Sequence, residues 1–276
     1  MAIIMNGKEV RDNLYKDLKE EVSNLEFTPC LTVVVVGDDE ASKVYVNNKI
    51  KSCEQLGIKS NVIKCDVNIS KEDLANIINS LNNDINCTGI LVQAPLPKHL
   101  NESEIFNLID KEKDVDGFNN YNAGQLVKDN SGIIPCTVKG IGYLLDYYNI
   151  DVSGKDVTIV GRSNIVGKPM ANYLINKDAT VTLCHSKTSD LRSKTISADI
   201  LIVAVGHPNL IDESYVKDGA IVIDVGINRI DNKLCGDVDF SSVKDKCSYI
   251  TPVPGGVGPM TVAMLMDNVL ERTRKK

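Results

Sequence analysis

The sequence has no tryptophan and only four phenylalanines, and aromatic residues make up 5% of its 276 positions. Long apolar runs are also missing, since none approaches the roughly 18 residues that a membrane-spanning helix needs. The first residues lack the basic start, apolar core and small-residue cleavage site of a signal peptide. We therefore expect no membrane partner and no secretion signal.

Closely spaced metal ligands are absent as well. None of the eight cysteines forms a Cys-x-x-Cys pair, and the three histidines are scattered. Scattered thiols fit a reducing cytoplasm better than disulfides or a zinc site. The pattern predicts a cytoplasmic protein without a metal.

No large excess of charge is present. The formal net charge is −6 and charged residues make up 25% of the chain, which argues against a general nucleic-acid binder. Apolar residues make up 43%, enough for a sizeable core, and the length suits one large or two modest domains.

What is present is an alternation of short apolar runs with segments of helical spacing, which predicts right-handed βαβ units and parallel sheets. The expected strands are 31–36, 61–67, 88–92, 157–160, 180–184, 200–205 and 220–224. The expected helices are 8–25, 40–56, 70–81, 101–110, 139–148 and a closing one over 262–270. Residues 111–137 are the least regular part, and a connection of that length is usually functional or disordered.

This α/β pattern predicts two α/β domains. Residues 1–137 and 254–276 would form the first, and residues 138–253 a second, Rossmann-like dinucleotide-binding domain. The C-terminal helix would return to the first domain. A ligand is expected in the cleft between the domains, outside the carboxyl ends of the strands.

A glycine turn follows the strand 157–160. Gly161 ends that strand and Gly167 opens a helical pattern, so backbone N–H groups and the helix dipole would converge on a phosphate. The spacing is G-x5-G rather than the G-x-G-x-x-G dinucleotide fingerprint, which leaves a plain strand-to-helix turn as the alternative. Arg162 and Ser163 favour nucleotide binding because they put a cation and a hydroxyl at the turn.

The residues after the next expected strand, 180–184, indicate whether the dinucleotide is NAD or NADP. In the usual fold this strand ends in an acidic residue that binds the ribose hydroxyl of NAD. Here Cys184, His185 and Ser186 follow it, and Asp178 lies at its other end. With no carboxylate to repel a 2′-phosphate, and with Arg162 and Ser186 available to bind it, the sequence predicts NADP.

Tyr45 and Lys49 lie four residues apart on an expected helix and so share one face. One interpretation is a solvated lysine beside a packed tyrosine. The other places Lys49 in a cleft, where desolvation favours the neutral amine and the residue can act as a base or polarise a water. Tyr45 would then offer its ring to a planar substrate.

Two more polar residues stand at predicted strand or turn ends. Gln93 ends a buried strand, where it is either a ligand contact or an ordinary strand-end residue. Asp116 lies in a glycine turn, either as a turn former or as an acceptor for two N–H groups of a heterocycle. The stretch 254–259 has three glycines and two prolines, which predicts an unusual backbone that a ligand can approach closely.

Six motifs in order resemble one family, the bifunctional methylenetetrahydrofolate dehydrogenase/methenyltetrahydrofolate cyclohydrolase, in its bacterial single-polypeptide form. The resemblance covers essentially the whole chain. Its motifs are Tyr45-x3-Lys49, Gly89-Ile90-Leu91-Val92-Gln93 before Pro-Leu-Pro, Lys113-Asp114-Val115-Asp116-Gly117, Pro135-Cys136-Thr137, Gly161-Arg162-Ser163-x2-Val166-Gly167-x-Pro169 and Pro252-Val253-Pro254-Gly255-Gly256-Val257-Gly258-Pro259-Met260-Thr261.

Two positions depart from the family pattern. Ala94 stands where leucine is usual after the glutamine, so the fit of folate in the substrate pocket is expected to differ. Val138 stands where proline is usual after Pro-Cys-Thr, which we interpret as a backbone difference at a helix start.

The resemblance implies a reaction in two steps on one bound tetrahydrofolate. Hydride passes from 5,10-methylenetetrahydrofolate to NADP, and water then opens the methenyl product to 10-formyltetrahydrofolate. The reaction belongs to one-carbon metabolism and supports purine biosynthesis. Family members are cytoplasmic homodimers joined through the cofactor domain, so we expect the same here.

The resemblance also implies site residues. Lys49 would act in the second step with Gln93 bonded to it or to the substrate, Asp116 would anchor the pterin amino group, and Tyr45 would stack on the aminobenzoyl ring. The other substrate-binding residues are Val92, Ala94, Pro254, Gly255, Gly256, Val257 and Gly258. NADP would bind Gly161, Arg162, Ser163, Ser186 and Ile227.

The alternative is an NADP-dependent dehydrogenase that lacks the cyclohydrolase step or acts on another small substrate. It would leave Tyr45, Gln93 and Asp116 without a shared purpose. A non-enzymatic nucleotide-binding module would not need the lysine and the glutamine.

Overall fold

The computed structural model describes residues 2–231 and 233–274, which form two compact units. The three-strand unit comprises Asn13–Cys136 and Val262–Lys276, and the six-strand unit comprises Met1–Asp12 and Thr137–Thr261. Each unit has its own parallel sheet, so the expected α/β class is confirmed. The predicted domain boundaries agree with this division near residue 137 and differ from it at residues 1–12 and 254–261; they remain a prediction.

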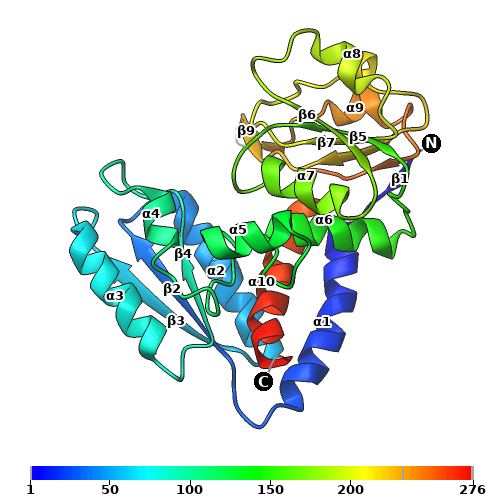
Figure 1. Ribbon diagram of the computed structural model, residues 1–276. Helices are drawn as coiled ribbons and strands as arrows, with labels where there is room; N and C mark the ends of the chain where they lie inside the picture. Colours follow the sequence, from blue (N-terminus) through cyan, green and yellow to red (C-terminus); the bar gives the residue numbers. More distant parts are fainter. Residues whose placement is uncertain (1, 232, 275–276) are drawn as a thin grey trace. The chain divides into compact units, whose positions relative to one another are not determined.

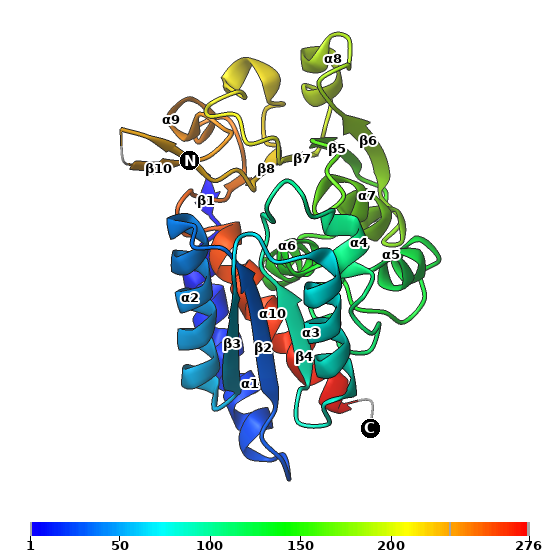
Figure 2. The same ribbon diagram turned by 90° about the vertical axis from the view of Figure 1, so that its left-hand side faces the viewer.

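The three-strand unit is built on β2, a strand that is buried along its whole length. Its sheet has the order β3-β2-β4 with all strands parallel, as Figure 2 shows. The strands are β2 (Cys30–Val36), β3 (Lys59–Cys65) and β4 (Gly89–Val92). A central parallel strand is covered on both faces, which explains why the run from Leu31 to Val36 is almost continuously apolar.

The helices of this unit include α2 (Glu40–Leu56), α3 (Lys71–Asn83), α4 (Glu102–Phe106) and α5 (Asn120–Val127). α1 (Gly7–Ser23) starts in the six-strand unit and continues in this one from Asn13. Ser70 caps α3, because its hydroxyl accepts a hydrogen bond from the backbone N–H of Asp73 over 3.0 Å. Such a cap satisfies one of the otherwise unpaired N–H groups at the start of a helix.

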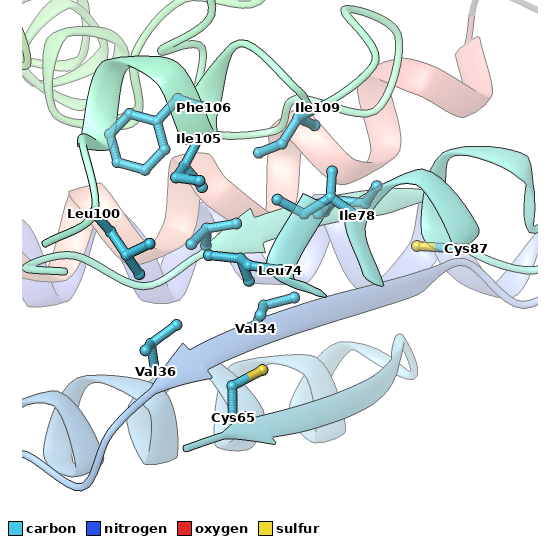
Figure 3. Close-up of a cluster of buried hydrophobic side chains, with 12 residues drawn as sticks. Val34, Val36, Cys65, Leu74, Ile78, Cys87, Leu100, Ile105, Phe106 and Ile109 are labelled. Carbon is cyan, nitrogen blue, oxygen red and sulfur yellow. The ribbon is translucent and has the colours of Figure 1, made fainter. Parts of the chain in front are cut away.

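A hydrophobic cluster fixes α3 and α4 to this sheet (Figure 3). Leu74 and Ile78 lie one turn apart on α3 and are fully buried against the side chains of the strands. Burial of each such side chain contributes about 1.5–3 kcal/mol relative to exposure. The buried members are Val34, Val36, Cys65, Leu74, Ile78, Cys87, Ile90, Val92, Leu100, Ile105, Phe106 and Ile109.

The six-strand unit has a Rossmann-like parallel sheet with the order β1-β11-β8-β7-β5-β6. The strands are β1 (Ile3–Ile4), β5 (Asp156–Val160), β6 (Thr180–Cys184), β7 (Ile200–Val203), β8 (Ile221–Asp224) and β11 (Tyr249–Ile250). A separate antiparallel hairpin pairs β9 (Asn228–Ile230) with β10 (Lys233–Cys235). In Figure 1, α7 (Gly167–Ile175) lies next to β5 and β6, against which it packs.

The other helices of this part are α6 (Cys136–Tyr147), α8 (Leu191–Thr195), the short 3-10 helix η1 (Glu213–Tyr215) and α9 (Phe240–Val243). The last helix, α10 (Val257–Arg274), starts in the six-strand unit and continues in the three-strand unit, as predicted. In the latter, the Arg274 guanidinium donates to both carboxylate oxygens of Glu21 on α1, over 2.7 and 2.6 Å.

Some elements differ from the prediction for local reasons. Helix α5 lies inside the segment expected to be irregular, and Asn119 caps it by accepting hydrogen bonds from the N–H groups of Tyr121 and Asn122. The helix expected over 101–110 ends at Phe106, and β3 begins and ends two residues earlier than expected. β1 and β11 have two residues each, too few for a periodic pattern.

Candidate active site

Lys49 and Gln93 meet in the three-strand unit. Lys49 lies in the third turn of α2 and Gln93 directly follows β4, and the Lys49 ammonium donates a hydrogen bond to Gln93 Oε1 over 2.9 Å. The Gln93 amide group in turn donates to the carbonyl oxygen of Ala94 over 2.6 Å. Both side chains are half-buried, which argues against the interpretation of Lys49 as a fully solvated surface lysine.

Asp116 lies close enough to Lys49 for their charges to interact. Its side chain is half-buried and accepts a weak hydrogen bond from the Cys136 thiol over 3.6 Å. Burial raises the pKa of Asp116, while the positive charge of Lys49 acts in the opposite direction and lowers it. The structure therefore brings lysine, amide and carboxyl groups from three different chain segments near one another; their role as a binding site remains a prediction.

Tyr45 lies one turn before Lys49 on α2 and is 42% exposed. An exposed ring on the face that carries Lys49 is available to a planar ligand. Val92 is different, because its side chain is 2% exposed and belongs to the core cluster around α3. A ligand could reach Val92 only through its backbone. Ala94 is half-buried, and the Ala94–Pro95 peptide bond is cis.

Asp114 organises the loop that carries Asp116, a role that sequence reasoning missed. Its buried carboxylate accepts hydrogen bonds from the backbone N–H groups of Gly117 (3.0 Å) and Asn119 (2.9 Å) and from the Asn122 side chain (2.9 Å). Burial raises its pKa and these hydrogen bonds lower it. The signal is an Asp three residues before a glycine that adopts a positive φ of 72°.

A residue of α10, Asn268, also holds this loop. The side chain of Asn268, which is 0% exposed, donates to the carbonyl oxygens of Val115 (2.9 Å) and Ile134 (3.1 Å). A buried amide that bonds two backbone carbonyls fixes both segments with respect to the helix. Val115 directly precedes Asp116 in the chain. Because α10 bonds the Val115 carbonyl, this helix also helps to position Asp116.

The glycine-rich stretch 254–258 belongs to the six-strand unit. The Val253–Pro254 bond is cis, Gly255 has a φ of 112°, and the N–H of Gly256 donates to the Pro252 carbonyl over 2.8 Å. A side chain at Gly256 would come within 2.7 Å of that carbonyl oxygen, so the tight backbone requires glycine. Val257 is buried and Gly258 half-buried at the start of α10. A part of these residues in folate binding remains a prediction.

The carboxyl ends of β5 and β6 carry most of the residues expected to bind the cofactor. Gly161 follows β5 with a φ of 124°, and a Cβ atom there would overlap the carbonyl oxygen of Ala204. Arg162 and Ser186 are exposed just after these two adjacent strands. Ile227, beyond β8, is 47% exposed. This edge of a parallel sheet is where a dinucleotide binds.

Ser163 has a second role, which the spacing alone does not reveal. Its hydroxyl accepts hydrogen bonds from the N–H groups of Val166 (3.1 Å) and Gly167 (3.4 Å) at the start of α7. A hydroxyl that accepts in this way can still donate its proton. Ser163 therefore stabilises the helix start and can also bind an anionic oxygen.

The residues at this edge fit NADP. The turn at Gly161 lets a ligand approach the backbone closely, and β6 ends in the buried Cys184 followed by His185 and Ser186 rather than a carboxylate. Within residues 2–231 and 233–274, no three His, Cys, Asp or Glu side chains are grouped as a metal would need. In the same residues, no helix is both long and apolar enough to cross a membrane.

Comparison with known proteins gives full-length matches. Residues 5–116 match the family described as tetrahydrofolate dehydrogenase/cyclohydrolase, catalytic domain, and residues 135–276 match its NAD(P)-binding domain. The chain is 52% identical to the bifunctional protein FolD of Agathobacter rectalis, over 100% of both chains.

Solved structures of the same family are similar to this chain over nearly its whole length. The bifunctional FolD methylenetetrahydrofolate dehydrogenase/cyclohydrolase of Campylobacter jejuni is 48% identical with a TM-score of 0.98, covering 100% of this chain and 99% of that one. The Trypanosoma brucei methylenetetrahydrofolate dehydrogenase-cyclohydrolase, solved with NADP and an inhibitor, is 36% identical with a TM-score of 0.95, covering 99% and 98%.

Proposed function

Because the chain belongs to the tetrahydrofolate dehydrogenase/cyclohydrolase family, we propose that Lys49, Gln93 and Asp116 form the centre of its folate site. The chain is a bifunctional enzyme. It oxidises 5,10-methylenetetrahydrofolate to 5,10-methenyltetrahydrofolate with NADP, and it hydrolyses that product to 10-formyltetrahydrofolate. The single observation that supports the assignment of residues best is the hydrogen bond between Lys49 and Gln93.

NADP supplies the hydride acceptor for the first step. The protein's part is to hold the methylene carbon, which loses its hydride and leaves a cationic methenyl group. Lys49 lies beside this carbon in the proposed arrangement. A positive substrate next to the lysine disfavours the charged ammonium, because like charges repel.

The neutral amine of Lys49 then acts as the base of the second step. Water forms a bond to the methenyl carbon and gives up one proton to the amine. The bond from that carbon to the pterin nitrogen then breaks; this nitrogen takes up a proton and the hydroxyl group loses its own, which leaves the formyl group. Gln93 Oε1 accepts the hydrogen bond from Lys49 and so orients its nitrogen. A positioned base of this kind contributes about 10²–10⁴-fold in rate.

Asp116 and Tyr45 bind the substrate. An ionised carboxylate accepts two N–H groups of a pterin at once, and the nearby Lys49 charge favours ionisation against the effect of burial. The exposed Tyr45 ring stacks on the aminobenzoyl ring. Backbone groups of Val92 and Ala94 complete the folate contacts proposed for the three-strand unit, and the assignment of residues 254–258 to folate remains a prediction.

The residues assigned to NADP are those at the carboxyl edge of the six-strand sheet. Arg162 and Ser186 would bind the 2′-phosphate, and Gly161 with Ser163 the pyrophosphate. Ile227, exposed at the same edge, would contact the cofactor through its apolar side chain.

One assay tests the proposed function. Protein, methylenetetrahydrofolate and NADP are mixed, and NADPH and 10-formyltetrahydrofolate are followed separately. Both products are expected. Without NADPH the proposal fails; NADPH without accelerated methenyl hydrolysis would leave a dehydrogenase alone, the alternative that the sequence left open.

We also propose that the enzyme is a cytoplasmic homodimer joined through the six-strand unit. The eight cysteines, all within the described residues, are reduced thiols, which suits a reducing compartment. The hairpin of β9 and β10 exposes Ile230 (43%) and Leu234 (40%), which two copies could bury. Sedimentation equilibrium should give twice the chain mass, and Leu234→Asp should lower it; a monomeric wild type would contradict this proposal.

A further inference from the structure

Two buried aspartates meet at the carboxyl edge of the six-strand sheet. Asp224 is the last residue of β8 and is 3% exposed; Asp237 follows the hairpin of β9 and β10 and is 0% exposed. The backbone N–H of Asp237 donates to Asp224 Oδ1 over 3.0 Å. We call this pair the aspartate clamp; the proposed function above gives it no role.

Asp237 holds the loop that follows β7. Its Oδ2 accepts the backbone N–H groups of Val205 (2.7 Å) and Gly206 (3.0 Å), and its Oδ1 accepts that of His207 (2.8 Å). Oδ1 also accepts a hydrogen bond from the Asn228 side chain over 2.8 Å, at the start of β9. Four donors on two oxygens use the full acceptor capacity of a carboxylate.

Asp224 holds the segment that carries Asp237. Besides the Asp237 N–H, its carboxylate accepts the N–H groups of Gly226 (3.0 Å) and Val238 (2.9 Å). Its own N–H donates to the Thr251 hydroxyl over 2.8 Å. The two aspartates therefore link the ends of β7 and β8 to the segment after the hairpin.

Two glycines make room for these carboxylates. A Cβ atom at Gly226 would overlap the carboxyl group of Asp237, and one at Gly236 would overlap that of Asp224. Neither glycine has a positive φ, so space rather than backbone conformation requires them. The local sequence, Asp224-x-Gly226 and Gly236-Asp237, is thus built around the two acidic groups.

Burying the two carboxylates of the clamp without a positively charged partner costs free energy. Every partner that the described structure gives these carboxylates is an uncharged N–H group. Burial raises the pKa of Asp224 to about 6, and the like charge of Asp237 adds to that increase. Buried groups with such costs occur preferentially at functional sites.

The place of the clamp in the sheet indicates what it serves. β5, whose following glycine turn would bind the pyrophosphate in the proposed site, has β6 on one side and β7 then β8 on the other. A dinucleotide extends across the carboxyl edge of such a sheet in two halves, so when the adenosine half lies over β6 the nicotinamide half lies over β7 and β8. The clamp holds the loops after these last two strands, which expose Val205 (37%) and Ile227 (47%).

We infer that Asp237 is a positioning residue for NADP, which fixes the loop Val205–His207 and Asn228 so that they form the surface under the nicotinamide half. This inference rests on the proposed NADP site. Asp237 does not itself contact the reacting atoms. It acts through the backbone that it binds.

Asp237→Asn tests the inference. An asparagine has one acceptor oxygen, and its NH2 group would face N–H donors that now meet a carboxylate oxygen. The loop after β7 should shift. We expect the KM for NADP to rise about tenfold or more and the dehydrogenase kcat to fall about tenfold, corresponding to the loss of one or two hydrogen bonds to a charged group. Hydrolysis of supplied methenyltetrahydrofolate, which needs no NADP, should stay within about twofold of wild type.

A binding measurement separates this inference from the proposed function. Calorimetric titration with NADP alone should show about tenfold weaker binding to Asp237→Asn than to wild type, whatever the wild-type turnover is. Val243→Ala is the matched control, because Val243 is fully buried in a hydrophobic cluster of the six-strand unit and its apolar side chain makes no hydrogen bond to either aspartate. It should lower Tm and leave the Kd for NADP unchanged.

Asn228→Ala is the second variant, for the case that Asp237→Asn does not fold. It removes one donor from Asp237 and should weaken NADP binding about three- to tenfold, with cyclohydrolase activity retained. The inference is overturned if the folded variants bind NADP as wild type does, or if the two activities fall in parallel.

Discussion

The ammonium of Lys49 donates a hydrogen bond to the side-chain oxygen of Gln93 over 2.9 Å, although 44 positions separate the two residues in the chain. The contact joins the middle of α2 to the carboxyl end of β4, the edge at which parallel sheets bind ligands. The Lys49 amine can gain or lose a proton, whereas the Gln93 amide keeps one state. The first two predictions below test this contrast in the second reaction step.

Lys49→Met should reduce cyclohydrolase activity by about 10²–10⁴-fold, because the variant loses the proposed base. Its unfolding free energy should stay within about 1 kcal/mol of wild type, since a half-buried lysine contributes little to the core. Hydrolysis of methenyltetrahydrofolate and urea unfolding measure the two effects. Lys51→Met, an exposed position on the same helix, is the control and should hydrolyse at the wild-type rate. Normal hydrolysis by Lys49→Met would refute the role of Lys49.

Gln93→Glu should slow cyclohydrolase activity at least about tenfold near neutral pH. The change keeps the hydrogen-bond acceptor but adds a negative charge 2.9 Å from the amine, which favours the ammonium over the neutral base. A pH–rate profile should show that raising the pH restores part of the rate. Gln55→Glu, exposed on α2, adds the same charge away from the site and should leave the profile unchanged. A wild-type profile in Gln93→Glu would contradict the proposed base.

Arg162→Ala should weaken NADP about tenfold or more and NAD much less, because the proposed partner of the guanidinium is the 2′-phosphate. KM values for both cofactors measure the difference. Lys155→Ala removes a positive charge next to the other end of β5, and it should affect neither cofactor. Equal losses for NADP and NAD in Arg162→Ala would count against the assignment.

Asp224 should titrate near pH 6 in the folded protein, the value that burial and the neighbouring Asp237 impose on its pKa. An unfolded aspartate has a pKa of about 3.9, so between about pH 4 and 6 the folded state binds more protons at this position. The contribution of Asp224 to stability therefore decreases as the pH rises through this window. From pH 4.5 to 7.5, wild type should lose about 2 kcal/mol relative to Asp224→Asn.

Urea unfolding of both proteins across that range measures the difference, and carboxyl carbon NMR gives the midpoint directly. Asp212 is an internal reference, because hydrogen bonds from Ser214 lower its pKa. A difference in stability that does not change with pH, together with an Asp224 midpoint near 4, would disprove the prediction.

The regular elements were largely predictable because their signals are local. The apolar run ending at Val36 and the caps of α3 follow from strand burial and from the chemistry of a helix start, and both are found. The two-residue strands β1 and β11 were not predictable, since their pairing partners lie far away in the chain. α5 was not predicted, because the only local indication of this helix is the N-cap residue Asn119 within a polar segment.

The residues of the candidate folate site were predictable in part, because their motifs are also local in the sequence. Motifs around Lys49, Gln93 and Asp116 indicated a folate site, but the spacing did not say that the lysine bonds to the glutamine. Asp114 and Asp116 look alike in sequence. Only the folded loop distinguishes them, because it bonds the first to backbone N–H groups and leaves the second close enough to Lys49 for their charges to interact.

The sequence by itself determined the α/β class, the alternation of strands and helices, and the absence of an acidic residue after β6, since periodicity and residue type act over a few neighbouring positions. The tertiary structure alone decided which polar groups share a buried space. The pairing of Asp224 with Asp237 is an example: thirteen positions separate the two aspartates, and their partners come from loops that only the parallel sheet brings to one edge. The physical reason is that hydrogen bonding and desolvation depend on distance in space, which the sequence does not contain.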